Sequence, residues 1–442
     1  MKNKFELLFI TLGLLALIGG LFFGVIAGLQ FVFPGFLDVI PFHKTRPLHV
    51  SLVVAWIFLA SIGGIYYYLP IQVGERLYSK KLSILHFLVF SITGIVIVFC
   101  YLFGKFGGRE YWEFPPVLAI PVVVSWLLFG WNYFKTAFKL ASGWPVYMWM
   151  WSTGIVFFLF TFSEAYVWLL PQVKENVIKE ITLQWKAYGA LVGSWNMLVY
   201  GTAIFLMEKI KKDETIGRSR IAFLMYFLGL TNLMFGWAHH IYNVPTAPWI
   251  RYFAYIISMT ELIILAKIIY NWKNAVKESL KDFNLLPYKF IVSSDVWIFL
   301  NLTLAIMLSI PAINVYTHGT HITVAHAMGS TIGINTMILL ASCLYLIDNY
   351  IKKEYTPKES KMIRSGYAIF NISLFVFWVS LIVAGIIKGI NVVEGGKTFQ
   401  EIMQLTEIPL TIFSFSGIIV FISLLMILIP ALKKTISFLF NK

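Results

Sequence analysis

Apolar segments of roughly 20 residues recur along the whole chain, and each is long enough to cross a lipid bilayer as an α-helix. Short polar segments separate them, and no stretch has the composition of a water-soluble domain. The segments span residues 6–33, 47–70, 83–104, 115–134, 146–170, 183–207, 220–243, 250–271, 289–311, 321–348, 362–387 and 408–432. The pattern predicts an all-α membrane protein with twelve transmembrane helices, which form a single domain over residues 1–442.

The composition agrees with this pattern, because 59% of the residues are hydrophobic and only 13% are charged. The net charge of +14 has a topological explanation. If the N-terminus is cytoplasmic, 25 of the 35 Lys and Arg residues fall at the two termini and in the loops on that side. Membrane proteins concentrate Lys and Arg in their cytoplasmic loops. Both termini are therefore predicted to be cytoplasmic, and the basic charge does not indicate binding to nucleic acid.

Four of the eight histidines lie near the outer ends of predicted helices that are distant in sequence. They are His49, the adjacent pair His239 and His240, and His326. Ionisable side chains inside transmembrane helices are rare and usually functional, and imidazole is the commonest neutral metal ligand. We therefore expect these helices to hold a haem or a metal ion at one level in the outer half of the membrane.

The other histidines are less easily assigned. His318 and His321 precede or open a predicted helix, where they could either ligate a metal or donate hydrogen bonds to haem propionates. His86 lies at the cytoplasmic start of its helix, as an interfacial residue or, less simply, as part of a proton path. Cys100 and Cys343 belong to no C-x-x-C-H motif, so the chain attaches no c-type haem covalently.

Five sequence motifs together resemble the large subunit of nitric oxide reductase, which belongs to the haem-copper oxidase superfamily. They are Arg46–His49 with Gly63–Tyr67, Gly108–Pro115, Gly236–His240 and Thr317–His326. They occur in the order and with the spacing of that family, whose number of helices is also twelve.

The resemblance implies two b-type haems and a second metal. His326 would be the proximal ligand of a high-spin haem b. His239 and His240 would bind a metal facing that haem, which is non-haem iron in the reductases and copper in the oxidases. His49 would be one axial ligand of a low-spin haem b.

The resemblance also implies roles for residues near the haem propionates. Glu110 and either Tyr66 or Tyr67 would lie there, where the family can hold a calcium ion. Glu113 would lie near the binuclear site or its proton path.

The chain departs from the family at two ligand positions. No histidine occurs between His86 and His239, so the third metal ligand of the family is missing and its position aligns with Tyr188 or Gly189. The remaining coordination would come from oxygen, with Glu164, Tyr188 and Asn196 as candidates in that order. Glu164 could instead carry protons or hold the structure by hydrogen bonds.

Met328 replaces the second helix-10 histidine of the family. Side chains at positions i and i+2 of a helix point about 200° apart, so Met328 would face away from the haem of His326. We expect it to ligate the low-spin haem together with His49. The alternative is that Met328 is a packing residue.

Three functions stay open on this evidence. The first is a respiratory enzyme in a bacterial or archaeal inner membrane that reduces nitric oxide to nitrous oxide. The second is a terminal oxidase or another enzyme converting nitric oxide or oxygen. The third is a di-haem electron-transfer or sensing protein without a second metal. A c-type cytochrome subunit or soluble cytochrome c is the expected electron donor, and membrane lipids and a small gas are the other expected partners.

Overall fold

The computed structural model describes residues 5–140, 143–267 and 285–440, and these residues are almost entirely helical. Twelve segments within them are long and apolar enough to cross a membrane, which confirms the all-α fold and the predicted number of spans. Most of these segments begin and end within a few residues of the bounds predicted from the sequence. The last residues of the predicted eighth span, 268–271, lie outside the described part of the chain.

The helices group into two compact units, which alternate along the chain. The first unit comprises residues 1–142, 342–380 and 407–442. The second comprises residues 143–341 and 381–406.

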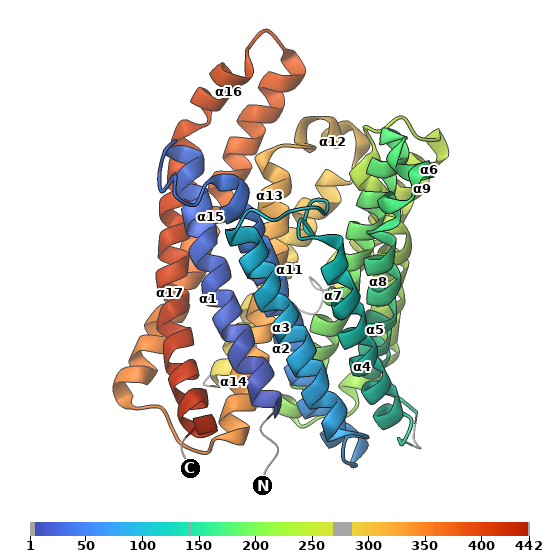
Figure 1. Cartoon of the computed structure of the whole chain (residues 1–442), viewed down its shortest axis with the longest axis vertical. Coiled ribbons are helices and arrows are strands. Elements are labelled where there is room, and N and C mark those ends of the chain that lie inside the picture. The colour runs from blue at the N-terminus through green and yellow to red at the C-terminus, as the bar shows by residue number, and fades with distance from the viewer. Residues whose placement is uncertain (1–4, 141–142, 268–284, 441–442) are drawn as a thin grey trace. The chain divides into compact units, whose positions relative to one another are not determined.

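The first unit is built from long membrane helices (Figure 1). They are α1 (Phe5–Val32), α2 (Phe42–Val73), α3 (Lys80–Leu102), α4 (Ala119–Ala137) after the short η1 (Pro116–Leu118), most of α14 (Met337–Tyr350), the first part of α15 (Pro357–Glu394) and α17 (Glu407–Phe440). Helix α1 packs against both α2 and α17, and α4 packs against α3 and α2.

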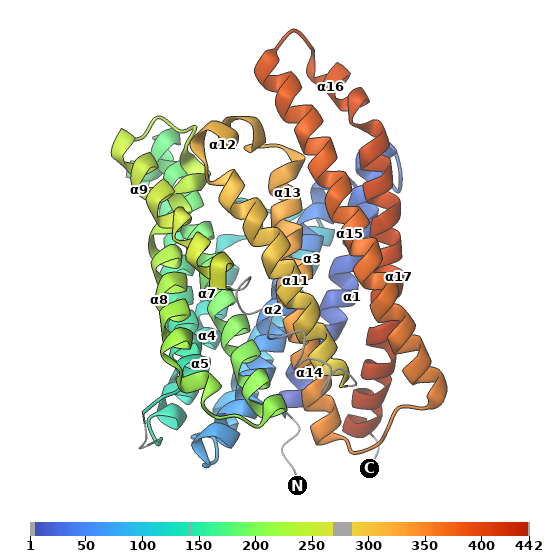
Figure 2. The same ribbon diagram turned by 180° about the vertical axis from the view of Figure 1, so that it is seen from behind.

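The second unit carries the histidine-rich segments (Figure 2). Its longer helices are α5 (Val146–Glu164), α7 (Val177–Lys211), α8 (Arg220–Phe235), α9 (Pro248–Met259), α11 (Leu286–Leu308) and α13 (His321–Met328). Its short elements are η2 (Val167–Leu169), α6 (Pro171–Lys174), η3 (Ile216–Arg218), η4 (Gly236–Ile241), α12 (Pro311–Thr317), η5 (Gly329–Thr336) and α16 (Phe399–Leu405).

Two departures from regular α-helix occur where the sequence places candidate ligands. Segment η4 is a 3-10 helix that follows α8 and contains His239 and His240. Segment η5 is a π-helix that follows His326 and Met328 directly. Its Gly333 packs so closely on Trp297 of α11 that a Cβ atom there would lie 2.5 Å from the indole ring. Wide helical turns of this kind are frequent at functional sites.

Glycines allow α1 and α2 to approach each other closely. A Cβ atom on Gly63 of α2 would lie 2.9 Å from Ile10 Cδ1 and 3.0 Å from Phe9 Cβ. A Cβ atom on Gly20 of α1 would lie 2.9 Å from Val53 Cγ2. Small residues at helix interfaces are the usual means by which membrane helices pack backbone against backbone.

We predict that Gly63→Leu destabilises the protein, because the added side chain must push α1 away from α2. Overpacking of this kind costs about 1–3 kcal/mol. Gly94→Leu on α3 is the matched control, since a Cβ atom there has no neighbour within 4 Å. Thermal unfolding in detergent should show a lower midpoint for Gly63→Leu and an unchanged midpoint for Gly94→Leu. Equal midpoints for the two variants would show that this contact does not limit stability.

Candidate haem and metal centre

His49 is oriented as a haem ligand by the backbone of α1. Its Nδ1 lies 2.7 Å from the carbonyl oxygen of Gly20, so Nδ1 donates and Nε2 keeps its lone pair. A Cβ atom on Gly24 would lie 2.7 Å from the same Nδ1, so only glycine leaves room for the ring. Histidines that bind metals commonly donate their second ring N–H to a carbonyl in this way. The contacts of His49 therefore fit the axial role that the sequence predicts.

The adjacent histidines of η4 lie side by side in the second unit. The ring centroids of His239 and His240 are 4.3 Å apart. Nδ1 of His239 lies 3.3 Å from Ser258 Oγ on α9. The ring of His240 stacks on Trp185 of α7, with centroids 5.5 Å apart and planes 12° from parallel. Contacts from two helices thus hold the pair in place.

Two further histidines lie within electrostatic range of this pair. They are His326 and His318, each close enough to influence the protonation of His239 and His240. Nδ1 of His326 is buried, and the backbone of Asn301 on α11 lies beside its ring without completing a good hydrogen bond. Burial lowers the pKa of His318, which keeps it neutral near pH 7. Four of the predicted ligand or propionate-binding residues therefore gather in one unit.

Lys388 of α15 lies beside this group of histidines. Its Nζ donates to the carbonyl oxygen of Gly319 at 3.1 Å, and its charge acts on His321. A lysine and two neighbouring histidines, His318 and His321, suit the carboxylates of a haem. The structure thus places both residues in a cationic setting, and metal ligation by either stays an open prediction.

Helix α7 packs against the segment that contains the histidine pair, and its own sequence contains no histidine. A Cβ atom on Gly189 would lie 3.5 Å from His240 Cδ2 and 2.9 Å from Trp237 Cβ. Gly189 is thus the residue of α7 that meets η4, together with Trp185 one turn before it. Tyr188 is buried, with 4% of its surface exposed. Gly189, one of the two residues with which the missing ligand aligns, therefore lies beside His240, and Tyr188 is its neighbour in the chain.

The described residues supply too few donors for a conventional metal site. They contain no group of three or more His, Cys, Asp or Glu side chains that could hold a metal ion. Glu164 at the end of α5 instead forms an ion pair with Lys186 of α7. Oδ1 of Asn196 accepts a hydrogen bond from Asn335 Nδ2 at 2.9 Å. Of the three roles expected for Glu164, the contact observed is the structural one.

The sequence does not reveal the pairing of Glu164 with Lys186. A lysine near the outer end of a membrane helix is expected to extend to the membrane surface. Lys186 instead lies 22 positions from its partner and binds it across two helices. An acid and a base at matching depth in two predicted helices are the signal that could have identified this ion pair.

Arg46 of α2 forms ion pairs with the segment between α3 and η1 in the first unit. Arg46 lies 3.4 Å from Glu110 and forms a second ion pair with Glu113. Burial raises the pKa of Glu113, and the Arg46 guanidinium opposes that shift. The resemblance implied that Glu110 and either Tyr66 or Tyr67 lie near the haem propionates, and in the structure both tyrosines lie far along α2 from Arg46. Tyr66 lies 20 residues, or about 30 Å, along α2 from Arg46, and its hydroxyl bonds to His86.

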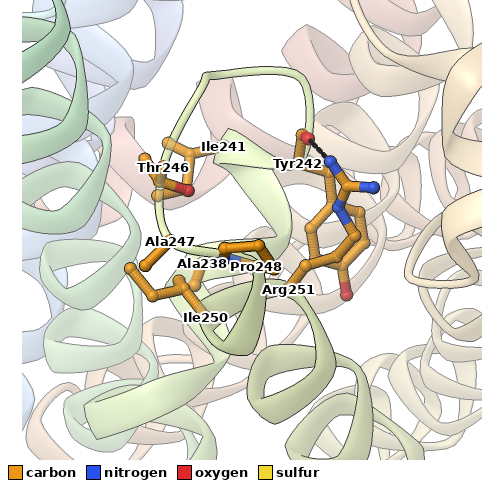
Figure 3. Close-up of a pocket in the computed structure, with 8 residues that line it drawn as sticks. All are labelled: Ala238, Ile241, Tyr242, Thr246, Ala247, Pro248, Ile250 and Arg251. Carbon is orange, nitrogen blue, oxygen red and sulfur yellow. Dashed lines mark hydrogen bonds between the residues drawn. The ribbon is translucent and has the colours of Figure 1, made fainter.

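A small hollow lies directly after the histidine pair (Figure 3). Its wall includes Ala238, Ile241, Tyr242 and Arg251, and Arg251 donates to the carbonyl oxygen of Tyr242 at 2.9 Å. Its volume of about 10 Å³ is close to the smallest space that holds one water molecule. The hydrogen bond of Arg251 therefore holds the loop between η4 and α9 in place. The hollow itself is too small for a substrate site.

Comparison with known proteins identifies the family. Residues 4–420 match the family described as Cytochrome C and Quinol oxidase polypeptide I. The chain belongs to this family, the catalytic subunits of the haem-copper oxidases. Family membership implies haems and a binuclear metal centre, and the contacts of the histidines fit the haem part of that centre.

Several relatives are similar over most of the chain. The chain is 24% identical to a nitric oxide reductase subunit of Stutzerimonas stutzeri, over 86% of this chain and 83% of that protein. It is 20% identical to the cbb3-type cytochrome c oxidase subunit CcoN1 of the same organism, over 84% and 80% of the two chains. A solved haem-copper terminal oxidase dimer superposes with a TM-score of 0.76 at 14% identity, covering 98% of this chain and 84% of that one.

We predict that His326→Ala removes the high-spin haem and leaves the low-spin haem. The imidazole would be the sole protein ligand of the high-spin iron, whereas the low-spin iron would be held by His49 and Met328. Pyridine haemochrome analysis and the reduced absorption spectrum measure the two haems separately. His43→Ala, at the exposed start of α2, is the histidine control and should keep both haems. A His326→Ala protein with both haems would refute the assignment.

We predict that His49 and Met328 are the axial ligands of the low-spin haem. His49 lies in the first unit and Met328 in the second. The structural support for this prediction therefore comes from the contacts of His49. Methionine ligation raises the reduction potential of haem iron. Near-infrared magnetic circular dichroism should show a histidine–methionine band, which Met328→Ala abolishes and Met307→Ala on α11 leaves intact. A bis-histidine band in the parent protein would contradict the prediction.

Proposed function

We propose that the chain reduces nitric oxide to nitrous oxide at a high-spin haem b that faces a second metal. The observation that carries this proposal is that His326 lies in the same unit as the pair His239 and His240, whose ring centroids are 4.3 Å apart. The similarity to a nitric oxide reductase subunit over more than four fifths of both chains supports the choice of substrate.

Each residue would have a separate task. His326 would hold the high-spin haem, and His239 and His240 would hold the second metal opposite it. When bound, the haem and the metal supply the redox chemistry, and the protein sets their ligands, their surroundings and access to them. Two molecules of nitric oxide, two electrons and two protons give one nitrous oxide and one water.

The second metal would need an oxygen ligand besides the two imidazoles. Glu164 would have to leave Lys186 to reach it, and Asn196 would have to release Asn335. Tyr188 adjoins Gly189, the residue of α7 that meets His240, so we propose Tyr188 ahead of the other two. An oxygen donor with two imidazoles suits iron better than copper.

A terminal oxidase is the second candidate function. The chain is also similar to oxidase subunits, and oxidases of this superfamily use a tyrosine near the metal. Tyr188 would be that tyrosine. The short donor set around His239 and His240 keeps a third candidate, a di-haem electron-transfer or sensing protein without a second metal.

The electron donor and the setting complete the proposal. We propose a c-type cytochrome subunit or a soluble cytochrome c as donor, in a bacterial or archaeal inner membrane with both termini cytoplasmic. A calcium ion near the propionates would have to compete with Arg46 for Glu110, and Tyr66 would not contribute.

Gas consumption and metal content together test the function. The purified protein, reduced by an artificial donor, should consume nitric oxide and release half as many molecules of nitrous oxide. Metal analysis should find two haems and one further iron per chain. Oxygen consumption with copper present would indicate the oxidase, and two haems without turnover of either gas would indicate the electron-transfer protein.

We predict that Tyr188→Phe lowers retention of the second metal by about tenfold or more, because the ring stays and the oxygen donor is lost. Glu164→Gln should leave the metal in place, since the carboxylate is engaged with Lys186. Iron content after dialysis against a mild chelator gives the comparison. Loss of the metal from Glu164→Gln with retention in Tyr188→Phe would restore Glu164 as the ligand.

A further inference from the structure

One face of α7 contacts both of the segments that carry candidate ligands in the second unit. Trp185 of this face stacks on the ring of His240 in η4. Oδ1 of Asn196 accepts a hydrogen bond from Nδ2 of Asn335 in η5, at 2.9 Å. At 100° per residue, Trp185 and Asn196 lie about 20° apart around the axis of α7. A single helix face thus touches the segment that contains the histidine pair and the segment that follows His326.

The opposite face of α7 is fixed to α5. Oγ of Ser194 donates to the carbonyl oxygen of Gly154 at 2.8 Å. A Cβ atom on Gly201 would lie 2.9 Å from the indole ring of Trp151, so glycine is needed for this approach. Ser194 and Gly201 lie about 160–180° around the helix axis from Trp185. Because α5 holds α7 on one side, the other side of α7 can serve as a fixed reference for the two ligand segments.

The contacts of α7 place His326 near the depth of the histidine pair. Helix α7 and the segment α13–η5 both start at the end of the unit where α6 and α12 lie, and they run in the same direction (Figure 1). Asn196 lies seven residues, or about 10 Å, beyond Gly189, which meets His240. Asn335 lies nine residues, or about 13 Å, beyond His326. The bond between the two asparagines therefore brings His326 close to the level of His240.

Segment η5 is the part of its helix where the backbone leaves the α-helical pattern. In a π-helix each hydrogen bond spans five residues, and such turns are frequent at functional sites. Oγ1 of Thr336 donates to the carbonyl oxygen of Thr331, also five residues earlier, at 2.8 Å. Gly333 lies against Trp297 of α11, and Asn335 bonds to α7. Because residues two apart point to nearly opposite sides of a helix, η5 is held between α7 and α11.

The side chain of Asn335 is polar and fully buried. It is 0% exposed, and its Oδ1 has no hydrogen-bond partner among the described residues. Burying an amide costs free energy unless the amide forms hydrogen bonds. Asparagines in membrane helices commonly bond to a neighbouring helix. The bond to Asn196 is the contact that offsets this cost, and it ties η5 to α7.

We propose that the hydrogen bond between Asn335 and Asn196 sets the depth and the rotation of His326 relative to His239 and His240. A misplacement of about 1 Å at a reacting site can cost about 100-fold in rate. Asn196 is then a positioning residue rather than an oxygen ligand of the second metal. This inference rests on the proposed function, because there the haem of His326 must face the metal of the histidine pair.

The iron–histidine stretching band of the reduced high-spin haem tests the proposal. Resonance Raman spectroscopy measures this band in the purified full chain with its haems, and the measurement needs no gas turnover. The band reports the angle and the hydrogen bonding of the proximal imidazole. Asn335→Leu and Asn196→Leu remove the bond at similar side-chain volume, so each should shift the band or split it into two. Nitric oxide reduction should fall by about tenfold or more, with the haem content unchanged.

Asn371 of α15 provides the matched control. Its Nδ2 donates to the carbonyl oxygen of Tyr367 at 2.8 Å, within its own helix and in the first unit. Asn371→Leu should keep the band and the turnover of the parent protein. Asn196→Leu changes a different helix from the one that carries His326, so it tests the bond even if Asn335→Leu loses its haem.

The outcomes separate the positioning role from the function. An unchanged band in both variants overturns the proposal, and loss of the second metal from Asn196→Leu with that unchanged band would make Asn196 a metal ligand instead. Loss of the high-spin haem from both variants shows that the bond holds the fold rather than the angle of the ring, which also overturns the proposal. A parent protein that shows the band and consumes no nitric oxide overturns the proposed function, while the band in the variants still decides whether the bond orients His326.

Discussion

The absence of water from the bilayer core is the constraint on which this structure depends. It obliges each membrane segment to satisfy its backbone by forming a helix, and it penalises every buried polar side chain that lacks a partner. The long apolar helices satisfy the backbone. The cost of burying polar side chains makes the few that are buried informative, because a membrane protein retains them where they bind a cofactor, carry protons or hold helices together.

Hydropathy predicted the spans well because it is a local property, and each run of about 20 apolar residues determines its own helix. It did not predict the 3-10 segment Gly236–Ile241 or the π segment Gly329–Thr336. In the π segment, Gly333 lies against Trp297 of α11, which is a contact that the local sequence does not reveal. The sequence located the candidate ligands, and packing determined how their rings are oriented.

The residues of the candidate site could be predicted from the sequence, but the side chains that contact them could not. Histidines in apolar helices stand out without any structure. In contrast, the ion pair of Glu164 with Lys186 and the stack of Trp185 on His240 join side chains on separate elements. For Tyr66, the sequence motif instead suggested a neighbour that the structure does not place beside it. Its motif matched the family, yet its position along α2 puts it with His86, far from Glu110.

The hydrogen-bond partners of three histidines show how one side chain can serve two kinds of site. In His49, His239 and His86, Nδ1 is held by a backbone carbonyl, a serine hydroxyl and a tyrosine hydroxyl respectively. Fixing one nitrogen leaves the other aimed at a defined point. A neutral Nε2 can bind iron where a cofactor can approach, as we propose for His49. The ring of His86 instead lies among the rings of Phe9, Tyr66 and Phe129. The groups around the second nitrogen, more than the ring itself, thus decide which histidines are candidate ligands.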